Sequence, residues 1–173
     1  AADEVLSGKH REHFVVDVYQ AGAGTSHNMN TNEVLANRGI EILGGKRGDY
    51  KIINPNDQVN MAQSTNDTFP TAMRLASLIM VQRLLPVIKH FQRTLEKKAK
   101  QFTKVVKSGR THLQDASPIT LGQEFEGYAE IVSKHYDLIN FSQKHLAELG
   151  IGGTAVGTGL NTHIKYRTLM AKN

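Results

Sequence analysis

The 173-residue sequence contains no cysteine, which excludes disulfide bonds, thiol catalysis and the usual cysteine-based zinc sites. No uninterrupted apolar run approaches the roughly 18 residues that would suggest a membrane span. No basic segment followed by an apolar one marks a signal peptide near Ala1. We therefore expect no membrane partner and a cytoplasmic location, or the mitochondrial matrix if the source is a eukaryote.

Acidic residues are fewer than basic ones, 16 against 21, so the formal net charge is +5. A positive chain can attract an acidic substrate, but it can equally attract nucleic acid. Much of the excess lies in one stretch, at Lys97, Lys98, Lys100, Lys104 and Lys107. We interpret this stretch as the solvated face of a helix and expect no nucleic-acid partner. The alternative is a nucleic-acid surface whose binding would weaken steeply with salt.

Two long segments have the 3.6-residue apolar spacing of amphipathic helices. The first stripe consists of Leu84, Ile88, Phe91, Leu95, Ala99, Phe102 and Val106. The second consists of Leu121, Phe125, Tyr128, Val132, Ile139, Leu146 and Leu149. We expect the first helix from about residue 71 to 106, with a kink or break at Pro86. Helices of this length rarely stand alone, so the pattern predicts a mainly α protein built on a helical bundle.

Residues 20–66 are rich in glycine and asparagine and have no strong apolar stripe. A helix is expected from just after Ser26 to about residue 43, where two glycines end it. Asn54 is the expected N-cap of a short helix with Pro55 at its first position. Residues 50–53 could form a short strand. Residues 107–118 connect the two long helices, and residues 150–161 form a Gly/Thr loop.

Three segments are dense in small polar residues, at 22–30, 63–67 and 109–115. Each lies at a predicted helix edge, where free N–H groups and the helix dipole favour anions. Gly22 and Gly24 begin a dinucleotide-binding pattern, but His27 occupies its third glycine position and no strand–helix–strand context surrounds it. Capping by Thr25 or Ser26 would explain one hydroxyl. It would not explain the helix-disfavouring side chains of Asn28, Asn30 and Asn32.

His112 is the side chain of the third segment best suited to proton transfer near neutral pH. A lone histidine in a loop is more often structural than catalytic, and the Ser64–Asp67 run has an equally ordinary interpretation as a helix cap. No metal site is predicted, since none of the eight histidines forms a His-Glu-x-x-His pair. No cofactor is predicted either.

Four segments, taken in order, resemble the aspartase/class II fumarase family. They are residues 20–34 (QAGAGTSHNMNTNEV), 63–72 (QSTNDTFPTA), 109–124 (GRTHLQDASPITLGQE) and 152–162 (GGTAVGTGLNT). The resemblance covers essentially the whole chain. It implies a mainly helical fold with a central bundle of long helices between two smaller domains. Residues 1–63 would end the N-terminal helical domain, and residues 64–173 would begin the bundle.

The resemblance also implies substrate-binding residues for a small dicarboxylate. Three would hold the carboxylate next to the carbon that loses its proton: Thr25, Ser64 and Thr65. Negative charge builds there in an aci-carboxylate intermediate, so preorganised donors lower the barrier. Three more would hold the other carboxylate and the leaving group: Asn66, Thr111 and His112. Thr111 and His112 are the predicted catalytic residues, and Asn56 and Asp57 could keep some function as a secondary anion site.

Members of this family are homotetramers whose active sites combine residues from different subunits. They also carry a later flexible loop, with a Gly-Ser-Ser pattern followed by Met-Pro and Lys-x-Asn, whose serine is the base. Nothing in this sequence matches that loop. The expectation is therefore an internal fragment, truncated at both ends and inactive alone.

The leaving group is ammonia in aspartases and water in fumarases. Ala23, Ser26, Thr65 and Asn54 resemble aspartase positions, whereas residues 152–156 and 161–163 look more like fumarase. The positions expected nearest the leaving group favour an aspartate ammonia-lyase. Fumarase, reversibly hydrating fumarate to L-malate, is the alternative. A non-catalytic helical assembly module is a further alternative.

Overall fold

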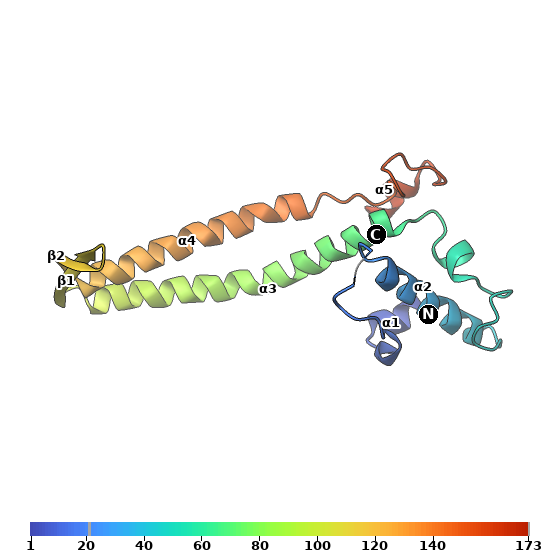
Figure 1. Cartoon of the computed structure of the whole chain (residues 1–173), viewed down its shortest axis with the longest axis horizontal. Coiled ribbons are helices and arrows are strands. Elements are labelled where there is room, and N and C mark those ends of the chain that lie inside the picture. The colour runs from blue at the N-terminus through green and yellow to red at the C-terminus, as the bar shows by residue number, and fades with distance from the viewer. Residues whose placement is uncertain (21, 173) are drawn as a thin grey trace. The chain divides into compact units, whose positions relative to one another are not determined.

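The structure, a computed structural model, describes residues 1–20 and 22–172, and Ala21 of the first polar segment lies outside them. Its elements are mainly helical, as predicted. In order they are α1 (Ala2–Leu6), a 3-10 turn η1 (Arg11–His13), α2 (Thr25–Ile42), a π-helical turn η2 (Pro55–Val59), α3 (Thr65–Gln101), β1 (Val106–Thr111), β2 (Gln114–Thr120), α4 (Leu121–Leu146) and α5 (Tyr166–Met170) (Figure 1).

The chain divides into two compact units, one formed by Ala1–Arg74 with Leu149–Asn173 and the other by Leu75–Glu148. The first unit therefore joins segments that are far apart in the sequence. The boundary predicted at residues 63/64 falls inside this first unit. The assignment of residues 1–63 to an N-terminal domain and of residues 64–173 to a central bundle stays a prediction.

The first unit packs around α2, whose inward side chains include Val34, Ala36 and Ile40. The helix begins at Thr25 and ends at Ile42, within two residues of the predicted bounds. Gly44 follows with φ +82°, the left-handed conformation that commonly ends a helix at glycine. The predicted helix and its glycine stop are confirmed.

The Asn54–Pro55 pair opens the short helix η2, as predicted. The Asn54 side chain accepts hydrogen bonds from the backbone N–H groups of Asn56 (2.8 Å) and Asp57 (3.2 Å). The strand considered for residues 50–53 is wrong, because this segment forms turns closed by local hydrogen bonds such as Ile52 N to Asp49 O (3.0 Å). The Cδ1 atoms of Ile52 and Ile53 lie close to Gly45 and Gly39 at the end of α2, although Ile52 remains 40% exposed.

The second unit contains most of α3 and all of α4, two long antiparallel helices joined by the β1–β2 hairpin (Figure 1). The rings of Phe102 and Phe125 lie 5.6 Å apart near the hairpin, and the Lys89 ammonium lies 5.1 Å from the Tyr136 ring centre further along. Leu95 is buried between them. The two predicted stripes are thus helical over most of their length, although much of the first stripe is exposed. Phe102, Val106 and Leu149 lie beyond the helix ends, and Val106 belongs to β1.

The predicted kink or break at Pro86 is not a break, because α3 runs uninterrupted from Thr65 to Gln101. The kink stays a prediction. The helix also begins six residues earlier and ends five residues earlier than expected. A proline removes only one helical N–H donor, and a long helix retains its other bonds around that position. At the start of α4, Thr120 forms a capping box in which Gln123 N donates to Thr120 Oγ1 (3.2 Å) and Thr120 N donates to Gln123 Oε1 (2.8 Å).

The connection at residues 107–118 is an antiparallel β-hairpin, which was not predicted. Its turn is formed by His112 and Leu113, with φ values of 48° and 61°. Two consecutive left-handed residues define the tight turn preferred by two-residue hairpins, which usually use Asn-Gly. The sequence carries no such signal and places Pro118 in β2, so the hairpin was hidden from pattern analysis.

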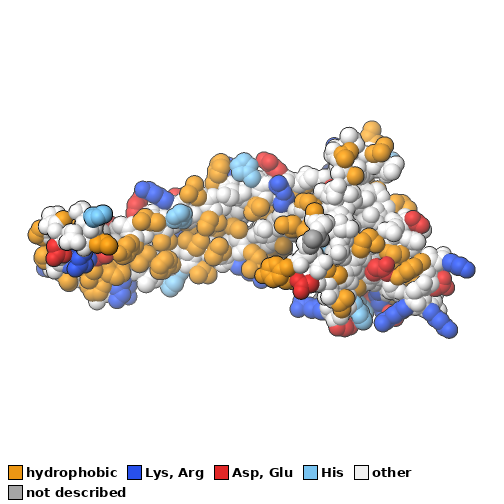
Figure 2. Space-filling model, in the orientation of Figure 1, with side chains coloured by type: hydrophobic (Ala, Val, Ile, Leu, Met, Phe, Trp, Pro, Cys, Tyr) orange, Lys and Arg blue, Asp and Glu red, His pale blue; other side chains and the backbone are white. Residues whose placement is uncertain are grey.

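Apolar side chains cover much of the exposed surface of the second unit (Figure 2). Within α3, one window of 18 residues has a mean hydropathy of 1.4, and 6% of that window is buried. By length and composition α3 could therefore cross a membrane, contrary to the expectation based on uninterrupted apolar runs. Helices of water-exposed bundles have the same composition on faces that pack against further helices, so this property does not by itself define a span.

A chain of ion pairs fastens α1 to α2 in the first unit. Arg38 Nη2 donates to Glu4 Oε1 (2.9 Å), and Arg38 Nη1 pairs with Glu41 at 3.2 Å. His10 Nε2 lies 3.1 Å from the other Glu4 oxygen. The guanidinium of Arg38, followed by His10, lowers the pKa of Glu4 from 4.5 to about 2. The carboxylate of Glu4 is therefore part of what holds the two helices together.

This ion pair predicts an acid-sensitive contribution to stability. Because the pKa of Glu4 is lower in the folded chain than in the unfolded one, the contribution is fully present above about pH 4.5 and is lost as the pH falls towards 2. We expect Glu4→Gln to lower the melting temperature at pH 6 but to reduce its further fall between pH 4.5 and 2, measured by circular dichroism. Glu126→Gln, an exposed acid on α4, is the control. An identical acid profile for Glu4→Gln and the unmodified chain would contradict this role.

Candidate functional site

The N-terminal ends of α2 and α3 meet in the first unit. Gly24, the residue before α2, has φ +86°, and a Cβ added there would lie 2.3 Å from Cδ1 of Phe69 in α3. The His27 ring stacks on the same Phe69 ring, with centres 5.6 Å apart and planes at 18°. This packing brings two polar segments, residues 22–30 and 63–67, to one place. Both helix ends carry partial positive charge, which favours an anion between them.

The first turn of α2 is not capped by a side chain within the described residues. The cap predicted from Thr25 or Ser26 is therefore wrong: Gly24 is the N-cap, and Thr25 lies inside the helix, with its hydroxyl donating to Gly22 O (2.8 Å). Glycine has no side-chain acceptor for the first N–H groups of the helix. The N–H of Thr25 donates to Gly22 O (3.2 Å), whereas those of Ser26 and His27 have no acceptor among the described residues and can bind an anionic ligand.

The first turn of α3 is capped, as predicted for the Ser64–Asp67 run. Ser64 Oγ accepts from Asn66 N (3.2 Å), and Asp67 Oδ1 accepts from Ser64 N (3.0 Å). Thr65 is the first residue of the helix and is partly buried. Because Ser64 Oγ only accepts in this arrangement, its hydroxyl proton remains free to be donated to a ligand.

The most important residue that sequence analysis missed is Asp67, which is 3% exposed. Its Oδ2 accepts hydrogen bonds from Gly152 N (3.0 Å) and Thr154 N (2.8 Å). The neighbouring Asn66 donates through Nδ2 to Ala155 O (2.8 Å). The start of α3 therefore holds the glycine-rich loop at 150–161, which is the fourth segment of the resemblance. The only signal in the sequence was an acid next to a capping serine, which has an ordinary explanation.

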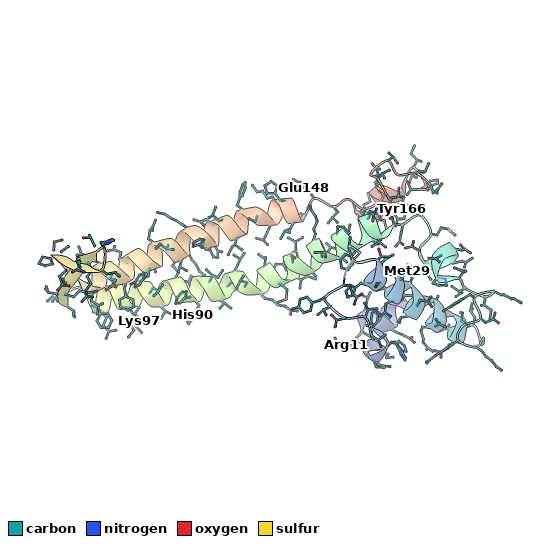
Figure 3. All side chains as sticks on the ribbon, viewed as in Figure 1. Arg11, Met29, His90, Lys97, Glu148 and Tyr166 are labelled. Atoms are coloured by element: carbon teal, nitrogen blue, oxygen red, sulfur yellow. The ribbon has the colours of Figure 1, made fainter. Side chains whose placement is uncertain are left out.

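Arg167 of α5 also holds this loop. Arg167 Nε donates to Gly152 O (3.0 Å), and Arg167 Nη2 donates to Gly157 O (3.2 Å). Tyr166, labelled in Figure 3, lies beside this contact. Burial, and then the negative charge of Asp67, raises the pKa of the Tyr166 hydroxyl. The loop is thus fixed between Gly152 and Gly157 by the charged side chains of Asp67 and Arg167.

A hollow in the first unit lies beside this loop. It is lined by Asn56, Asn60, Met61, Ala62, Gln63, Ser64, Thr154, Ala155, Val156, Leu160 and Asn161. Ser64, a predicted substrate residue, therefore shares a hollow with Asn56 of the predicted secondary anion site. Asp57 is exposed on the same short helix, where its backbone N–H is bonded to Asn54. The hollow is rich in amide and hydroxyl groups, which can bind a carboxylate without a buried counter-charge.

The three asparagines of α2 that seemed to favour binding have structural partners. Asn28 and Asn32 donate to Asn60 Oδ1 at 3.2 and 3.1 Å. Asn30 donates to His13 O (2.9 Å) and accepts from Val15 N (3.0 Å). These side chains tie α2 to the segments before and after it. Their polarity is thus explained by the fold rather than by a ligand.

Thr111 and His112 belong to the second unit, at the end of β1 and in the hairpin turn. Both are exposed, and His112 is held in the left-handed conformation, which is uncommon for a residue other than glycine. Such strain often marks functional positions. The hairpin places these two residues together. Their relation to Thr25, Ser64, Thr65 and Asn66 stays a prediction.

The basic stretch around Lys97 has the features of a solvated helix face. Figure 3 shows His90 and Lys97 on the side of α3 turned away from α4. Lys98 lies over the Phe102 ring at 5.5 Å, and Lys107 forms an ion pair with Glu124 in α4. Ordinary intramolecular contacts therefore account for part of this charge.

Comparison with known proteins shows the class of the chain. The family model described as "Lyase" matches residues 1–173. Among curated relatives, the class II fumarate hydratase of Photorhabdus laumondii is 54% identical over 99% of this chain and 37% of its own length. The aspartate ammonia-lyase of Bacillus subtilis is 50% identical over 100% of this chain and 36% of its own length. The chain thus spans little more than a third of these relatives.

Solved structures agree with this assignment. The fumarate lyase:delta crystallin from Brucella melitensis bound to cobalt has a TM-score of 0.84 and 50% identity, and the match covers 95% of this chain and 36% of that one. The class II fumarase from Schistosoma mansoni has a TM-score of 0.84 and 43% identity, over 96% and 35%. Fold and sequence therefore assign the chain to a class of mainly helical proteins, the fumarate lyase superfamily. Within that class, the chain belongs to the aspartase/class II fumarase family of the fumarate lyase superfamily.

The packing of Gly24 against Phe69 predicts a specific loss of stability on substitution. Gly22 and Gly24 share a φ of +86°, but a Cβ at Gly22 would meet nothing within 4 Å. We expect Gly22→Ala to cost about 1 to 2 kcal/mol through its backbone conformation alone. Gly24→Ala adds a clash of roughly 1 to 3 kcal/mol. Chemical denaturation of both variants measures the difference. Equal losses would show that the Phe69 contact does not constrain this site, whereas partial recovery by Phe69→Leu in the Gly24→Ala background would support it.

Proposed function

We propose that the protein containing this chain eliminates ammonia from L-aspartate to give fumarate. The observation that carries the proposal is the junction of two helix N-termini, one of them uncapped, beside a hollow lined by amides and hydroxyls. This is an environment for a small anion. Family membership supports the reaction class, since relatives are named both aspartate ammonia-lyase and fumarate hydratase.

In this proposal Thr25, Ser64 and Thr65 hold the carboxylate next to the carbon that loses its proton. The hydroxyl proton of Ser64 and the N–H groups of Ser26 and His27 have no acceptor among the described residues, so they are suitable donors. They are oriented before substrate arrives, so they can stabilise the negative charge that develops on that carboxylate without reorganisation. The Thr25 hydroxyl is engaged with Gly22 O and would have to rotate to bind substrate.

Asn66, Thr111 and His112 hold the other carboxylate and the leaving group. Asn66 uses one amide N–H on Ala155 O and keeps its oxygen and second N–H for substrate. His112 can transfer a proton to or from the leaving group near neutral pH. Asn56 and Asp57 are proposed as a secondary anion site next to Ser64.

The exposed apolar face of the second unit supports a homotetramer as the functional form. In α3 this face includes Met80, Leu84, Val87 and Phe91, which recur every three or four residues and are all at least 45% exposed. Contiguous apolar surface of this kind usually marks an interface. A tetramer built on these helices would allow hairpin residues of one subunit to complete the site of another.

Fumarase is the second candidate, with water in place of ammonia as the leaving group. It is supported by the 54% identity to a class II fumarate hydratase and by residues 152–156 and 161–163 of the loop. Ammonia is favoured by Ala23, Ser26, Thr65 and Asn54. A single hydroxyl more or less near the leaving group can decide between an amine and water.

The choice can be tested on the protein that contains this chain by following fumarate absorbance with L-aspartate and, separately, with L-malate. We expect turnover of L-aspartate and at least 100-fold slower turnover of L-malate, in line with discrimination by a site that hydrogen-bonds its substrate. The opposite preference would make the protein a fumarase. No turnover of either substrate would contradict the proposal and favour a non-catalytic assembly module. The 173-residue chain alone is expected to be inactive.

The proposed roles of the hairpin residues predict distinct losses of activity. His112→Asn should lower kcat about 100- to 10,000-fold if His112 transfers a proton. Thr111→Val should lower kcat about 10-fold, because it removes one hydrogen bond. His135→Ala, an exposed histidine on α4, is the matched control and should leave kcat unchanged. Equal activity of His112→Asn and the control would remove His112 from the catalytic residues.

A further inference from the structure

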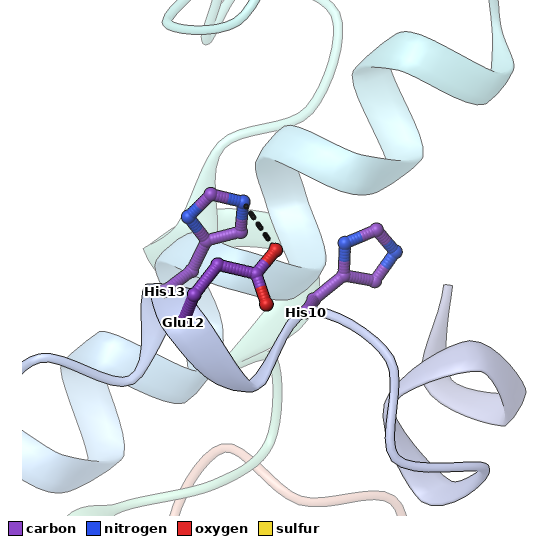
Figure 4. Close-up of side chains that lie close together, drawn as sticks. All are labelled: His10, Glu12 and His13. Atoms are coloured by element: carbon purple, nitrogen blue, oxygen red, sulfur yellow. Dashed lines mark ion pairs between the residues drawn. The ribbon is translucent and has the colours of Figure 1, made fainter.

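Three potential metal ligands lie together in the first unit, outside the region discussed above. His10, Glu12 and His13 come from one tight turn after α1, where His10 has φ 63° and η1 follows it. One ligand atom from each lies within 4.8 Å of the other two (Figure 4). Sequence analysis predicted no metal site because it compared spacings along helix faces. Here the spacing is i, i+2, i+3, and the left-handed backbone at His10 turns its side chain towards the other two.

The separation of these atoms is close to what a transition-metal ion requires. Zinc bonds to nitrogen and oxygen are about 2.0 to 2.1 Å long, so two ligand atoms of a tetrahedral site lie about 3.3 Å apart. His13 Nε2 and Glu12 Oε1 are already 3.5 Å apart. Both side chains are partly exposed, at 41% and 69%, so small side-chain rotations can close the remaining distance without disturbing the core.

The position of His10 is fixed from outside the cluster. Its Nε2 lies 3.1 Å from Glu4 Oε2, which leaves Nδ1 as the nitrogen on the side of Glu12 (Figure 4). Histidines that bind metals almost always donate their other N–H to a carboxylate or carbonyl, which fixes the tautomer and makes the free nitrogen a better ligand. Glu4 is itself held by Arg38 at 2.9 Å. The chain therefore contains a ligand set together with its supporting carboxylate.

We propose that His10, Glu12 and His13 bind one divalent transition-metal ion of the zinc class. Two imidazoles and one carboxylate suit Zn²⁺, Co²⁺ or Ni²⁺, whereas Mg²⁺ and Ca²⁺ prefer oxygen ligands alone. Three protein ligands leave a coordination position for water or another small ligand. His10 and His13 also line a hollow with Asn30, Glu33, Asn37 and Arg38, so that position has room beside it. The bound ion would link the turn through Glu4 to α1 and α2.

The test is a titration of the protein containing this chain, without an affinity tag, with Zn²⁺ by calorimetry and with Co²⁺ by visible absorption. We expect one bound ion per chain. His13→Ala should weaken binding at least 10-fold, and Glu4→Gln, which changes a supporting residue only, should weaken it about 10- to 100-fold. His135→Ala is the matched control and should bind as the unmodified protein does. Circular dichroism checks that each variant is folded.

Two further results decide the chemistry of the site. Millimolar Mg²⁺ should not displace Co²⁺, and the Co²⁺ spectrum should change in the folded His13→Ala variant. Equal Zn²⁺ affinity of His13→Ala and the unmodified protein would overturn the assignment. Displacement of bound Co²⁺ by Mg²⁺ at a concentration similar to that of Co²⁺ would also overturn the assignment, because it would indicate oxygen ligands alone. None of these readouts uses lyase activity, so they stand apart from the proposed reaction.

Discussion

The buried carboxylate of Asp67 is the interaction on which the first unit most depends. It accepts three backbone hydrogen bonds, from Ser64 at the start of its own helix and from Gly152 and Thr154 in a loop about 85 residues later. Hydrogen bonds to charged groups contribute about 1.5 to 3 kcal/mol each. Loss of this carboxylate would leave buried N–H groups without acceptors. One side chain therefore both caps α3 and positions the loop beside Ser64.

The arrangement around Phe69 gives the same region its electrostatic character. The missing side chain of Gly24 allows the start of α2 to approach the ring, and His27 stacks on it. Because Gly24 offers no side-chain cap, the N–H groups of Ser26 and His27 have no acceptor among the described residues. The same glycine thus permits the close packing and leaves these two donors for the anion that the proposed function requires. A bulkier residue there would interfere with both.

Local signals in the sequence predicted much of the fold. The bounds of α2, the Asn54 cap of η2 and the helical character of α3 and α4 follow from caps, glycines and apolar periodicity, which act within a few residues. The clusters at residues 22–30 and 63–67 were also recognised as features of helix starts. Pattern analysis could not reveal contacts that depend on distant partners. Asp67 is an example, since its partners Gly152 and Thr154 are brought near by the fold. The His10 turn was missed for a different reason, because its i, i+2, i+3 spacing depends on the left-handed backbone at His10.

The same limit explains why polar residues were misjudged in α2. Asn28 and Asn32 looked out of place in a helix, yet they share Asn60 as an acceptor 28 to 32 residues away. A polar residue with low helix propensity can therefore either bind a ligand or stabilise the fold. Only the position of its hydrogen-bond partner distinguishes these two roles.

The hairpin turn illustrates how the fold can hold a side chain of proposed function in a costly conformation. His112 and Leu113 both have positive φ, at a cost of about 1 to 2 kcal/mol each for residues other than glycine. A turn selected for stability alone would use Asn-Gly. The hairpin tolerates this strain because β1 and β2 are paired on both sides of the turn, and α4 begins directly after β2 with a full capping box. Rigid flanking elements thus keep the two side chains of the turn exposed, with Leu113 at 92%. That geometry suits residues that act on something outside their own unit, which is what a composite active site requires.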